Sequence, residues 1–258
     1  MGHKTIITGT AYEITGGKTL INGAGYSIAK GKAMVGGTVY EVMFGTPIGE
    51  LEVGNSVFIN LNGVSTEFLI VQQGLPSSDY DSSCEGTWLL MKDCYESRVW
   101  DSTNNDYENS DIHSYLNNTF VNLFDSDIMN TIKQVKIPYR QGSGKSNTVL
   151  CGSLGLSTKV FLLSLAEIGI SSSYAPTIGT VLGYFNGATN SRRIAKLNES
   201  ATYWWLRNPT NSGYDSVWQV NSGGFIDYAY GSWELGSVRP CIILPFDILV
   251  DGDFKIIT

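Results

Sequence analysis

The sequence predicts an α+β protein that is preceded by a small all-β module. Two observations lead to this prediction. The first 47 residues repeat a short pattern built around glycine, and in the rest of the chain helix-like stretches lie between strand-like stretches. Helices in the middle with strands on both sides favour an α+β architecture over a parallel, doubly wound sheet. With 258 residues and a hydrophobic fraction of 42%, the chain is long enough for a sizeable core.

The N-terminal module is a repeat with a spacing of fourteen residues. KTIITGTAYEI (4–14), KTLINGAGYSI (18–28) and KAMVGGTVYEV (32–42) share their lysine, glycine and tyrosine positions. Apolar residues alternate about a glycine turn in each unit, which predicts two short paired strands. One unit cannot bury its own apolar face, so we expect residues 1–47 to be an oligomerisation or docking module ahead of a larger domain over 48–258. A local β-meander packed on its own domain is the alternative.

The larger domain begins and ends with predicted strands. These strands cover 65–73, 87–93, 159–164, 216–220, 225–230 and 237–245. The turn NSGG joins two of them into a predicted hairpin.

Helices are predicted in the middle of this domain. Ser110 can cap a helix over 111–120, and Asp125 or Ser126 can cap a second helix that runs through Ile128, Ile132 and Val135. Ser164 and Glu167 form a capping-box pattern ahead of a short third helix.

Composition excludes two classes of function. The formal net charge of −7 argues against nucleic-acid binding, because phosphate recognition needs clustered Lys and Arg. No apolar run reaches membrane-spanning length, and the N-terminus MGHKTIITG lacks a signal-peptide core. We therefore expect neither membrane insertion nor export by the ordinary secretory route.

The cysteines and histidines do not form a recognisable metal site. The histidines are His3 and His113, and the cysteines, which include no C-x-x-C pair, are Cys84, Cys94, Cys151 and Cys241. We predict free, mostly buried thiols, with a Cys84–Cys94 disulfide as the alternative. DSTNNDYENSD (101–111) and DGDFK (251–255) lack the spacing of a calcium loop, so turn and cap chemistry explains them, with a structural calcium as the alternative.

Catalytic motifs are not evident either. QGSGKSN (141–147) departs from a phosphate loop because Tyr139 stands where the first glycine is required, so a surface loop is predicted there. A Ser or Cys nucleophile usually needs a base, and His113 lies within a predicted helix without an evident partner. We therefore predict that the protein is not an enzyme and has no cofactor.

Residues 208–237 have the composition of a binding loop. Sixteen of these thirty residues are Asn, Ser, Gly or Tyr, and none is Lys or Arg. Tyrosine and tryptophan supply rigid contact area, while Ser, Gly and Asn adapt their hydrogen bonds. The alternative is a glycine-rich hairpin in which the aromatic residues only stabilise strand pairs.

Several ordered motifs resemble a domain family of formally unknown function in bacterial and prophage proteins. They include YWWLRNP (203–209), VWQVNSGG (217–224) and SVRPCIILP (237–245), and the resemblance extends upstream to about residue 50. That family carries W-W-L-R-S-P, V-x-x-V-x-x-x-G and G-V-R-P-A in the same order. Here Asn208 replaces the serine, while Ser237 and Cys241 replace the glycine and the alanine. The N-terminal repeats resemble short modules of phage structural proteins.

Such domains are similar to the C-type lectin-like superfamily, which also contains formylglycine-generating enzymes and the variable proteins of diversity-generating retroelements. The resemblance implies a lectin-like fold with a fixed scaffold and a displayed, diversifiable ligand-binding face. The scaffold would include Trp204, Trp205, Leu206, Arg207, Trp218, Arg239 and Pro240. The displayed set would be drawn from Ser212, Gly213, Tyr214, Asp215, Gln219, Asn221, Ser222, Phe225, Asp227, Tyr228, Tyr230, Trp233, Glu234 and Leu235.

The same resemblance implies a phage or prophage tail-tip protein that binds a host cell-surface receptor, protein or glycan, without catalysis. Such a protein would assemble in the host cytoplasm, lie in the virion tail and contact other tail proteins. A homotrimer would let several weak contacts act together. One alternative is a structural fibre or baseplate component. The other is an enzyme similar to the formylglycine generators, but Cys151 and Cys241 do not match the cysteine motif of that family.

Overall fold

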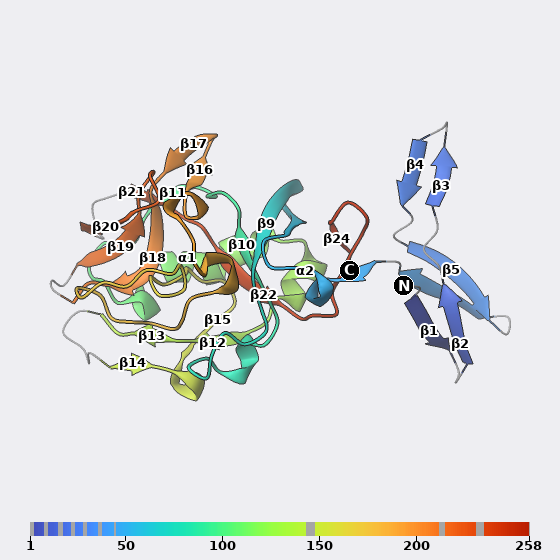
Figure 1. Cartoon of the computed structure of the whole chain (residues 1–258), viewed down its shortest axis with the longest axis horizontal. Coiled ribbons are helices and arrows are strands. Elements are labelled where there is room, and N and C mark those ends of the chain that lie inside the picture. The colour runs from blue at the N-terminus through green and yellow to red at the C-terminus, as the bar shows by residue number, and fades with distance from the viewer. Residues whose placement is uncertain are drawn as a thin grey trace.

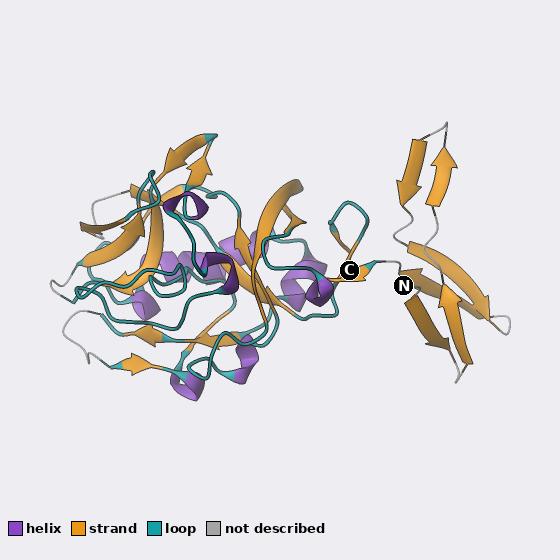
Figure 2. Ribbon diagram, in the orientation of Figure 1, coloured by secondary structure: helices purple, strands orange, loops and turns teal. Residues whose placement is uncertain are grey.

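The structure of the protein is a computed structural model in which strands predominate over helices (Figure 2). It describes residues 45–142, 148–211, 215–230 and 235–257, together with the backbone of short strands between residues 3 and 43. Sheets and a few short helices occur together, which confirms the α+β class. Within these ranges no helix is long and apolar enough to cross a membrane.

Each N-terminal repeat unit forms one antiparallel hairpin, as its alternating pattern predicts. The pairs are β1 (His3–Ile7) with β2 (Thr10–Ile14), β3 (Lys18–Ile21) with β4 (Ala24–Ser27), and β5 (Lys30–Val35) with β6 (Thr38–Met43). The role of the repeats in assembly stays a prediction.

A four-stranded antiparallel sheet lies in the centre of the larger domain (Figure 1). Its order is β22 (Cys241–Leu244), β10 (Thr87–Met91), β9 (Val64–Gln73) and β8 (Ser56–Leu61). β9 and β10 lie where the sequence predicts strands. β22 is shorter than the predicted strand 237–245, because Ser237 ends the strand β21 (Leu235–Ser237) and residues 238–240 belong to neither strand. The Arg239 guanidinium there donates to the carbonyls of Met91 and Lys92 at 2.9 and 2.7 Å.

A five-stranded sheet lies at one end of the domain, at the left of Figure 1. Its order is β11 (Ser97–Val99), β21 (Leu235–Ser237), β18 (Trp204–Pro209), β19 (Ser216–Val220) and β20 (Ile226–Tyr230). β19 and β20 form the predicted hairpin, with Trp218 opposite Tyr228 and Gln219 opposite Asp227. β18 is buried along its whole length and pairs with β19 and β21. β20 is therefore an edge strand, next to the buried inner strands β19 and β18.

Short strand pairs complete the domain. They are β12 (Val135–Ile137) with β15 (Leu156–Thr158), β13 (Tyr139–Arg140) with β14 (Val149–Leu150), and β16 (Ala195–Leu197) with β17 (Ser200–Thr202). β23 (Leu249–Val250) pairs with β24 (Ile256–Ile257) and with β7 (Thr46–Pro47). The chain thus pairs with the C-terminal strands two residues before the predicted boundary at 48.

The helix α1 (Asp111–Asn118) forms where the apolar spacing predicts it. The Ser110 hydroxyl accepts the N–H of His113 at 3.2 Å, as expected for an N-cap. Ile112, Tyr115 and Leu116 are buried against the core.

The helix α2 (Ser126–Thr131) is shorter than predicted. Ile128, Ile132 and Val135 are all buried, but Val135 starts β12 instead of a further helical turn. Asp125 occupies the N-cap position, yet its carboxylate accepts from Asn60 Nδ2 at 3.3 Å instead of capping. Apolar spacing alone could not distinguish these outcomes, because a short helix followed by a strand buries the same residues.

The apolar segment 159–164 is buried and extended, but it is not the ladder strand that the sequence predicts. It meets β22 at an isolated bridge. Its backbone groups bind side chains instead: the Leu162 N–H donates to Tyr107 Oη at 2.9 Å, and Arg207 Nη1 donates to the Leu162 carbonyl at 2.8 Å. Side chains thus supply bonds that a neighbouring strand would otherwise make.

The predicted capping box of Ser164 and Glu167 is present. The Ser164 N–H donates to Glu167 Oε2 at 2.9 Å, and the Glu167 N–H donates to Ser164 Oγ at 3.2 Å. The predicted helix is reduced to a turn over 165–169. Gly169 has a φ of 73°, a left-handed conformation that ends helical turns.

The same Glu167 carboxylate forms a fully buried, bidentate ion pair with Arg207 of β18. Arg207 Nη1 lies 2.5 Å from Oε2, and Nη2 lies 2.6 Å from Oε1. Tyr80 Oη donates to Oε1 at 2.8 Å, and Arg207 also donates to the carbonyls of Pro138 and Leu162. Burial opposes the charge of Arg207, but the Glu167 carboxylate outweighs this effect and holds the pKa of Arg207 above its ordinary value.

Loss of this ion pair is expected to destabilise the fold strongly. Arg207→Met leaves the buried Glu167 carboxylate without its partner, which costs about 3–5 kcal/mol. Urea unfolding followed by tryptophan fluorescence measures the change. The control Lys92→Met breaks the Lys92–Glu67 pair, whose side chains are 50% and 27% exposed, and should cost under about 1 kcal/mol. Equal losses in the two variants would contradict the assignment.

Candidate recognition surface

The adjacent tryptophans of β18 fix the two faces of the five-stranded sheet. Trp204 Nε1 donates to the carbonyl of Arg193 at 2.9 Å, and the Arg239 guanidinium lies 4.9 Å from the centre of the Trp204 ring. Trp205 Nε1 donates to the carbonyl of Arg98 in β11 at 2.8 Å. Successive side chains of a strand point to opposite faces, so Trp204 ties β18 to the segment at Arg193 outside the sheet, while Trp205 ties β18 to β11 within the sheet.

Gly236 of β21 lets the ring of Trp205 lie directly against the backbone. A Cβ at this position would lie 2.4 Å from Trp205 Cε2, a distance that real Cβ atoms do not adopt. The close approach explains why a glycine stands here in a strand.

All residues that the family resemblance assigns to the scaffold are buried. They are Trp204, Trp205, Leu206, Arg207, Trp218, Arg239 and Pro240. Their burial is compatible with a fixed frame.

Among the described members of the predicted displayed set, the exposed residues are Ser222, Phe225, Asp227, Tyr228 and Leu235, while Asp215 and Asn221 are half-buried. Phe225, Tyr228 and Leu235 are 59%, 60% and 68% exposed. The Tyr228 ring packs edge-on against the buried Trp218, with ring centres 6.1 Å apart. An exposed aromatic ring is thus held in place by the frame beneath it.

Gln219 is buried, so the prediction that it is displayed is wrong. It is 4% exposed and lies between Trp205 of β18 and Asp227 of β20. β19 is an inner strand with all of its residues buried, so neither face of it reaches the surface. Among the described residues, the Gln219 carbonyl Oε1 has no hydrogen-bond partner.

Asn221 shapes the turn between β19 and β20. Its Oδ1 accepts the N–H groups of Gly223 and Phe225 at 3.0 and 3.1 Å. A side chain that closes a turn in this way is set by the backbone, so Asn221 is less free to vary than its exposed neighbours.

The remaining predicted members lie outside the described residues. They are Ser212, Gly213, Tyr214, Trp233 and Glu234, together with the side chain of Tyr230. The surface loop predicted over 141–147 also lies outside them from residue 143 onward.

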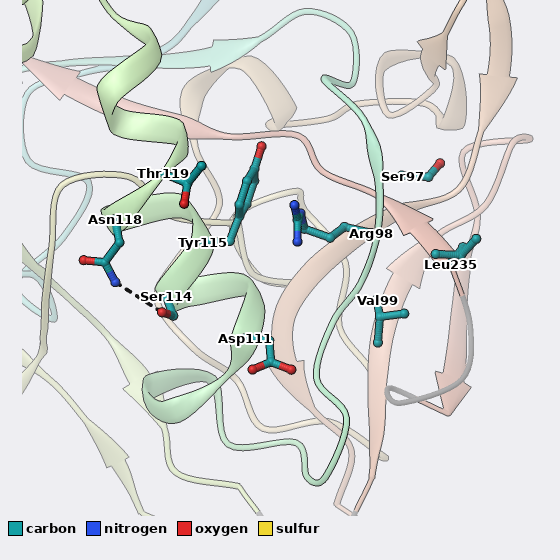
Figure 3. Close-up of a pocket in the computed structure, with 9 residues that line it drawn as sticks. All are labelled: Ser97, Arg98, Val99, Asp111, Ser114, Tyr115, Asn118, Thr119 and Leu235. Atoms are coloured by element: carbon teal, nitrogen blue, oxygen red, sulfur yellow. Dashed lines mark hydrogen bonds between the residues drawn. The ribbon is translucent and has the colours of Figure 1, made fainter.

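A groove of about 640 Å³ between β11 and α1 lies beside Leu235, and the sequence did not indicate it (Figure 3). The Arg98 guanidinium stacks over the ring of Tyr115, 3.8 Å from its centre, and Arg98 Nε donates to Glu96 at 2.8 Å. The other lining residues are Ser97, Val99, Asp111, Ser114, Asn118 and Thr119. In the sequence, the α1 side of this groove is indicated only by polar helix positions with a spacing of three and four residues. These are Asp111, Ser114 and Asn118.

A family model described as Domain of unknown function (DUF6273) matches residues 85–246. The chain belongs to this family. The match includes the tryptophan pair of β18, the β19–β20 hairpin and Arg239. No curated protein and no solved structure matches the chain.

The cysteines of this family member are free, as predicted. Cys84, Cys94 and Cys241 are buried, while Cys151 is half-buried. Burial raises the pKa of both Cys84 and Cys94 to about 12. Thiols with a raised pKa carry little thiolate near neutrality, so these are poor nucleophiles.

The oxygen-rich segments are used by turns. Asp101 Oδ1 accepts from the N–H groups of Thr103 and Asn104, and its Oδ2 accepts from the Asp111 N–H. Asp251 Oδ1 accepts from two N–H groups of its own loop. In the part of the chain that the structure describes, no three His, Cys, Asp or Glu side chains are grouped to hold a metal ion.

His113 packs inside the fold against Tyr107 and the backbone of Glu108. Its ring lies 5.1 Å from that of Tyr107, and Nδ1 lies 3.2 Å from the carbonyl oxygen of Glu108. Nε2 is buried and has no partner in the described ranges. Burial is the main cause that lowers the pKa of His113 below its ordinary value of 6.5.

His113 is expected to make stability decline in mild acid. Because its folded pKa lies below 6.5, the unfolded chain binds a proton more readily, and stability present above that pH is lost as the pH falls below it. Between about pH 7.5 and about pH 5, the free energy of unfolding should fall more in the wild type than in His113→Gln. Urea unfolding at each pH measures this difference. Parallel pH profiles would contradict it.

Proposed function

We propose that this protein is a phage or prophage tail-tip protein whose larger domain recognises a receptor on the host cell surface. The domain has a C-type lectin-like fold in this proposal, and recognition involves no catalysis. The observation that carries it is an edge strand with exposed aromatic side chains on a buried frame. Tyr228 stands on this edge strand and Phe225 directly precedes it, while Trp204, Trp205 and Arg207 are buried in β18, two strands away in the same sheet.

The chemistry of the exposed residues supports recognition. Tyr and Phe bury large areas with little loss of side-chain entropy, and binding energy concentrates in such anchors. The Tyr228 ring also packs against Trp218, so its side chain loses less conformational entropy on binding. The buried thiols and the isolated His113 give no support to an enzymatic alternative.

Diversification of the surface is part of the proposal. Phe225, Tyr228 and Leu235 are more than half exposed, and exposed side chains are replaced at little cost to stability. The frame cannot vary in this way, because Trp204, Trp205 and Arg207 hold several elements together. In the region whose codons a retroelement would rewrite, positions that tolerate replacement therefore lie close to positions that do not.

The N-terminal hairpins would join copies of the chain, as a homotrimer in this proposal, and bind other tail proteins. A single recognition surface is small, so several linked copies would raise the overall strength of attachment. The glycine-centred repeats support this role because one hairpin alone is too small to be stable.

Loss of the exposed aromatic pair is expected to abolish attachment. The variant Phe225→Ala with Tyr228→Ala removes two side chains that are 59% and 60% exposed. Apparent affinity of the labelled full-length protein for susceptible bacterial cells should fall about thirtyfold or more. Flow cytometry measures this affinity on a panel of bacterial strains related to the strain that carries the gene.

The control for that experiment is Phe254→Ala, which removes an aromatic side chain that is 45% exposed in the C-terminal segment. It should bind as the wild type does, and all variants should keep the same thermal unfolding midpoint. Unchanged attachment of the double variant would overturn the proposed surface. So would a wild type that binds none of the strains.

The genome gives an independent check of diversification. We expect a reverse-transcriptase gene nearby and a near-copy of the codons for residues 203–245 that differs only where the copy has adenine. Sequencing of sibling isolates should place substitutions at Phe225, Asp227, Tyr228 and Leu235, and none at Trp204, Trp205 or Arg207. Variation at the buried set would contradict the division between frame and surface.

A further inference from the structure

The loop over residues 171–175 lies next to the start of the proposed recognition surface. The Asn211 N–H donates to the Tyr174 carbonyl at 2.9 Å, and Asn211 Nδ2 donates to the Ser173 carbonyl at 3.3 Å. Asn211 follows β18 directly and leads into the segment that ends at Asp215. Residues far apart in the sequence therefore meet at one end of the five-stranded sheet.

Hydrogen bonds within this loop and to β18 hold it in place. Tyr174 N–H donates to Ser172 Oγ at 3.2 Å, and the Ala175 N–H donates to the Ser172 carbonyl at 3.3 Å. Asn208 Nδ2 donates to the carbonyl of Pro176 at 3.0 Å, while Asn208 Oδ1 accepts the N–H of Leu165 at 2.8 Å. Asn208 stands where the resembling family has serine, and it is fully buried, so it serves as a tether and is not itself displayed.

Tyr174 projects from the loop into solvent. Its exposed fraction of 69% is the largest among the described large apolar side chains. The loop has the same Ser and Tyr composition as the proposed surface, and Ser171 and Ser173 beside Tyr174 are also exposed. A rigid backbone that presents an aromatic side chain loses little entropy on binding.

The shape of the exposed residues indicates the kind of partner. Tyr174, Phe225, Tyr228 and Leu235 are large and mostly apolar, while charges of both signs lie near them: the carboxylates Asp215 and Asp227, and the Arg98 guanidinium beside Leu235. Leu235 and Phe225 offer no hydrogen bond to a partner, so they favour an apolar contact. Aromatic anchors with few charges are typical of the centre of protein interfaces.

We infer that Tyr174 is a further anchor residue of the proposed surface, and that the partner of this surface is a protein with an apolar patch. This inference rests on the proposed function. It adds a contact outside the region 203–245, on a loop that diversification of that region leaves unchanged.

Binding of the full-length Tyr174→Ala variant to susceptible cells tests the anchor. Apparent affinity should fall about tenfold or more, while Tyr174→Phe keeps the ring and should stay within about threefold of the wild type. Phe254→Ala serves again as the exposed aromatic control. Thermal unfolding midpoints should not change, since the Tyr174 side chain is exposed.

The outcomes separate this inference from the proposed function. If Phe225→Ala with Tyr228→Ala loses attachment but Tyr174→Ala keeps it, the anchor assignment is wrong and the recognition surface stands. If neither variant loses attachment, the proposed surface itself fails. Equal losses in Tyr174→Ala and Tyr174→Phe would show that the hydroxyl, and not the ring, is needed, which also overturns the anchor.

Treatment of the cells tests the class of partner. Proteinase digestion of the cell surface should remove binding sites for the wild-type protein, whereas periodate oxidation of surface glycans should leave them. Loss of binding after periodate alone would overturn the protein partner and indicate a glycan. Binding that survives both treatments would overturn it as well.

Discussion

The buried ion pair between Glu167 and Arg207 is the interaction on which most of the larger domain depends. Arg207 belongs to the central strand of the five-stranded sheet, while Glu167 closes the turn after the buried segment 159–164. The same guanidinium holds the carbonyls of Leu162 and Pro138. One side chain thus joins the sheet, the extended segment and the turn. A buried ion pair is favourable only in a narrow range of geometries. This contact therefore specifies how the sheet, the segment and the turn are arranged, as well as contributing to stability.

The frame and the proposed surface use the same strands in opposite ways. β18 has neighbours on both edges and is buried throughout, so its side chains are chosen by packing. β20 has a partner on one edge, and residues such as Asp227 and Tyr228 face solvent. Evolution can change the second group without loss of the first. The arrangement separates stability from specificity within a single sheet.

Much of this organisation could be predicted from the sequence, and the exceptions share a cause. The repeat hairpins, α1 with its Ser110 cap and the β19–β20 hairpin are local structures, which periodicity and turn residues determine. The burial of Gln219 could not be predicted, because it depends on where β19 lies within the sheet. The short α2, the side-chain bonds of segment 159–164 and the loop that carries Tyr174 likewise depend on distant partners. The groove beside α1 forms only because β11 and the helix pack together. The polar positions of α1 could be predicted from the sequence, but the packing of β11 against them could not.

The position of Arg239 affects how the larger domain folds. Its guanidinium binds the carbonyls of Met91 and Lys92, and β22 then pairs with β10 in the interior of the domain. These contacts join residues about 150 positions apart in the chain. A growing polypeptide on the ribosome therefore cannot complete this core until residues 239–244 have emerged. Folding of the larger domain is governed by long-range closure and not by successive addition of elements.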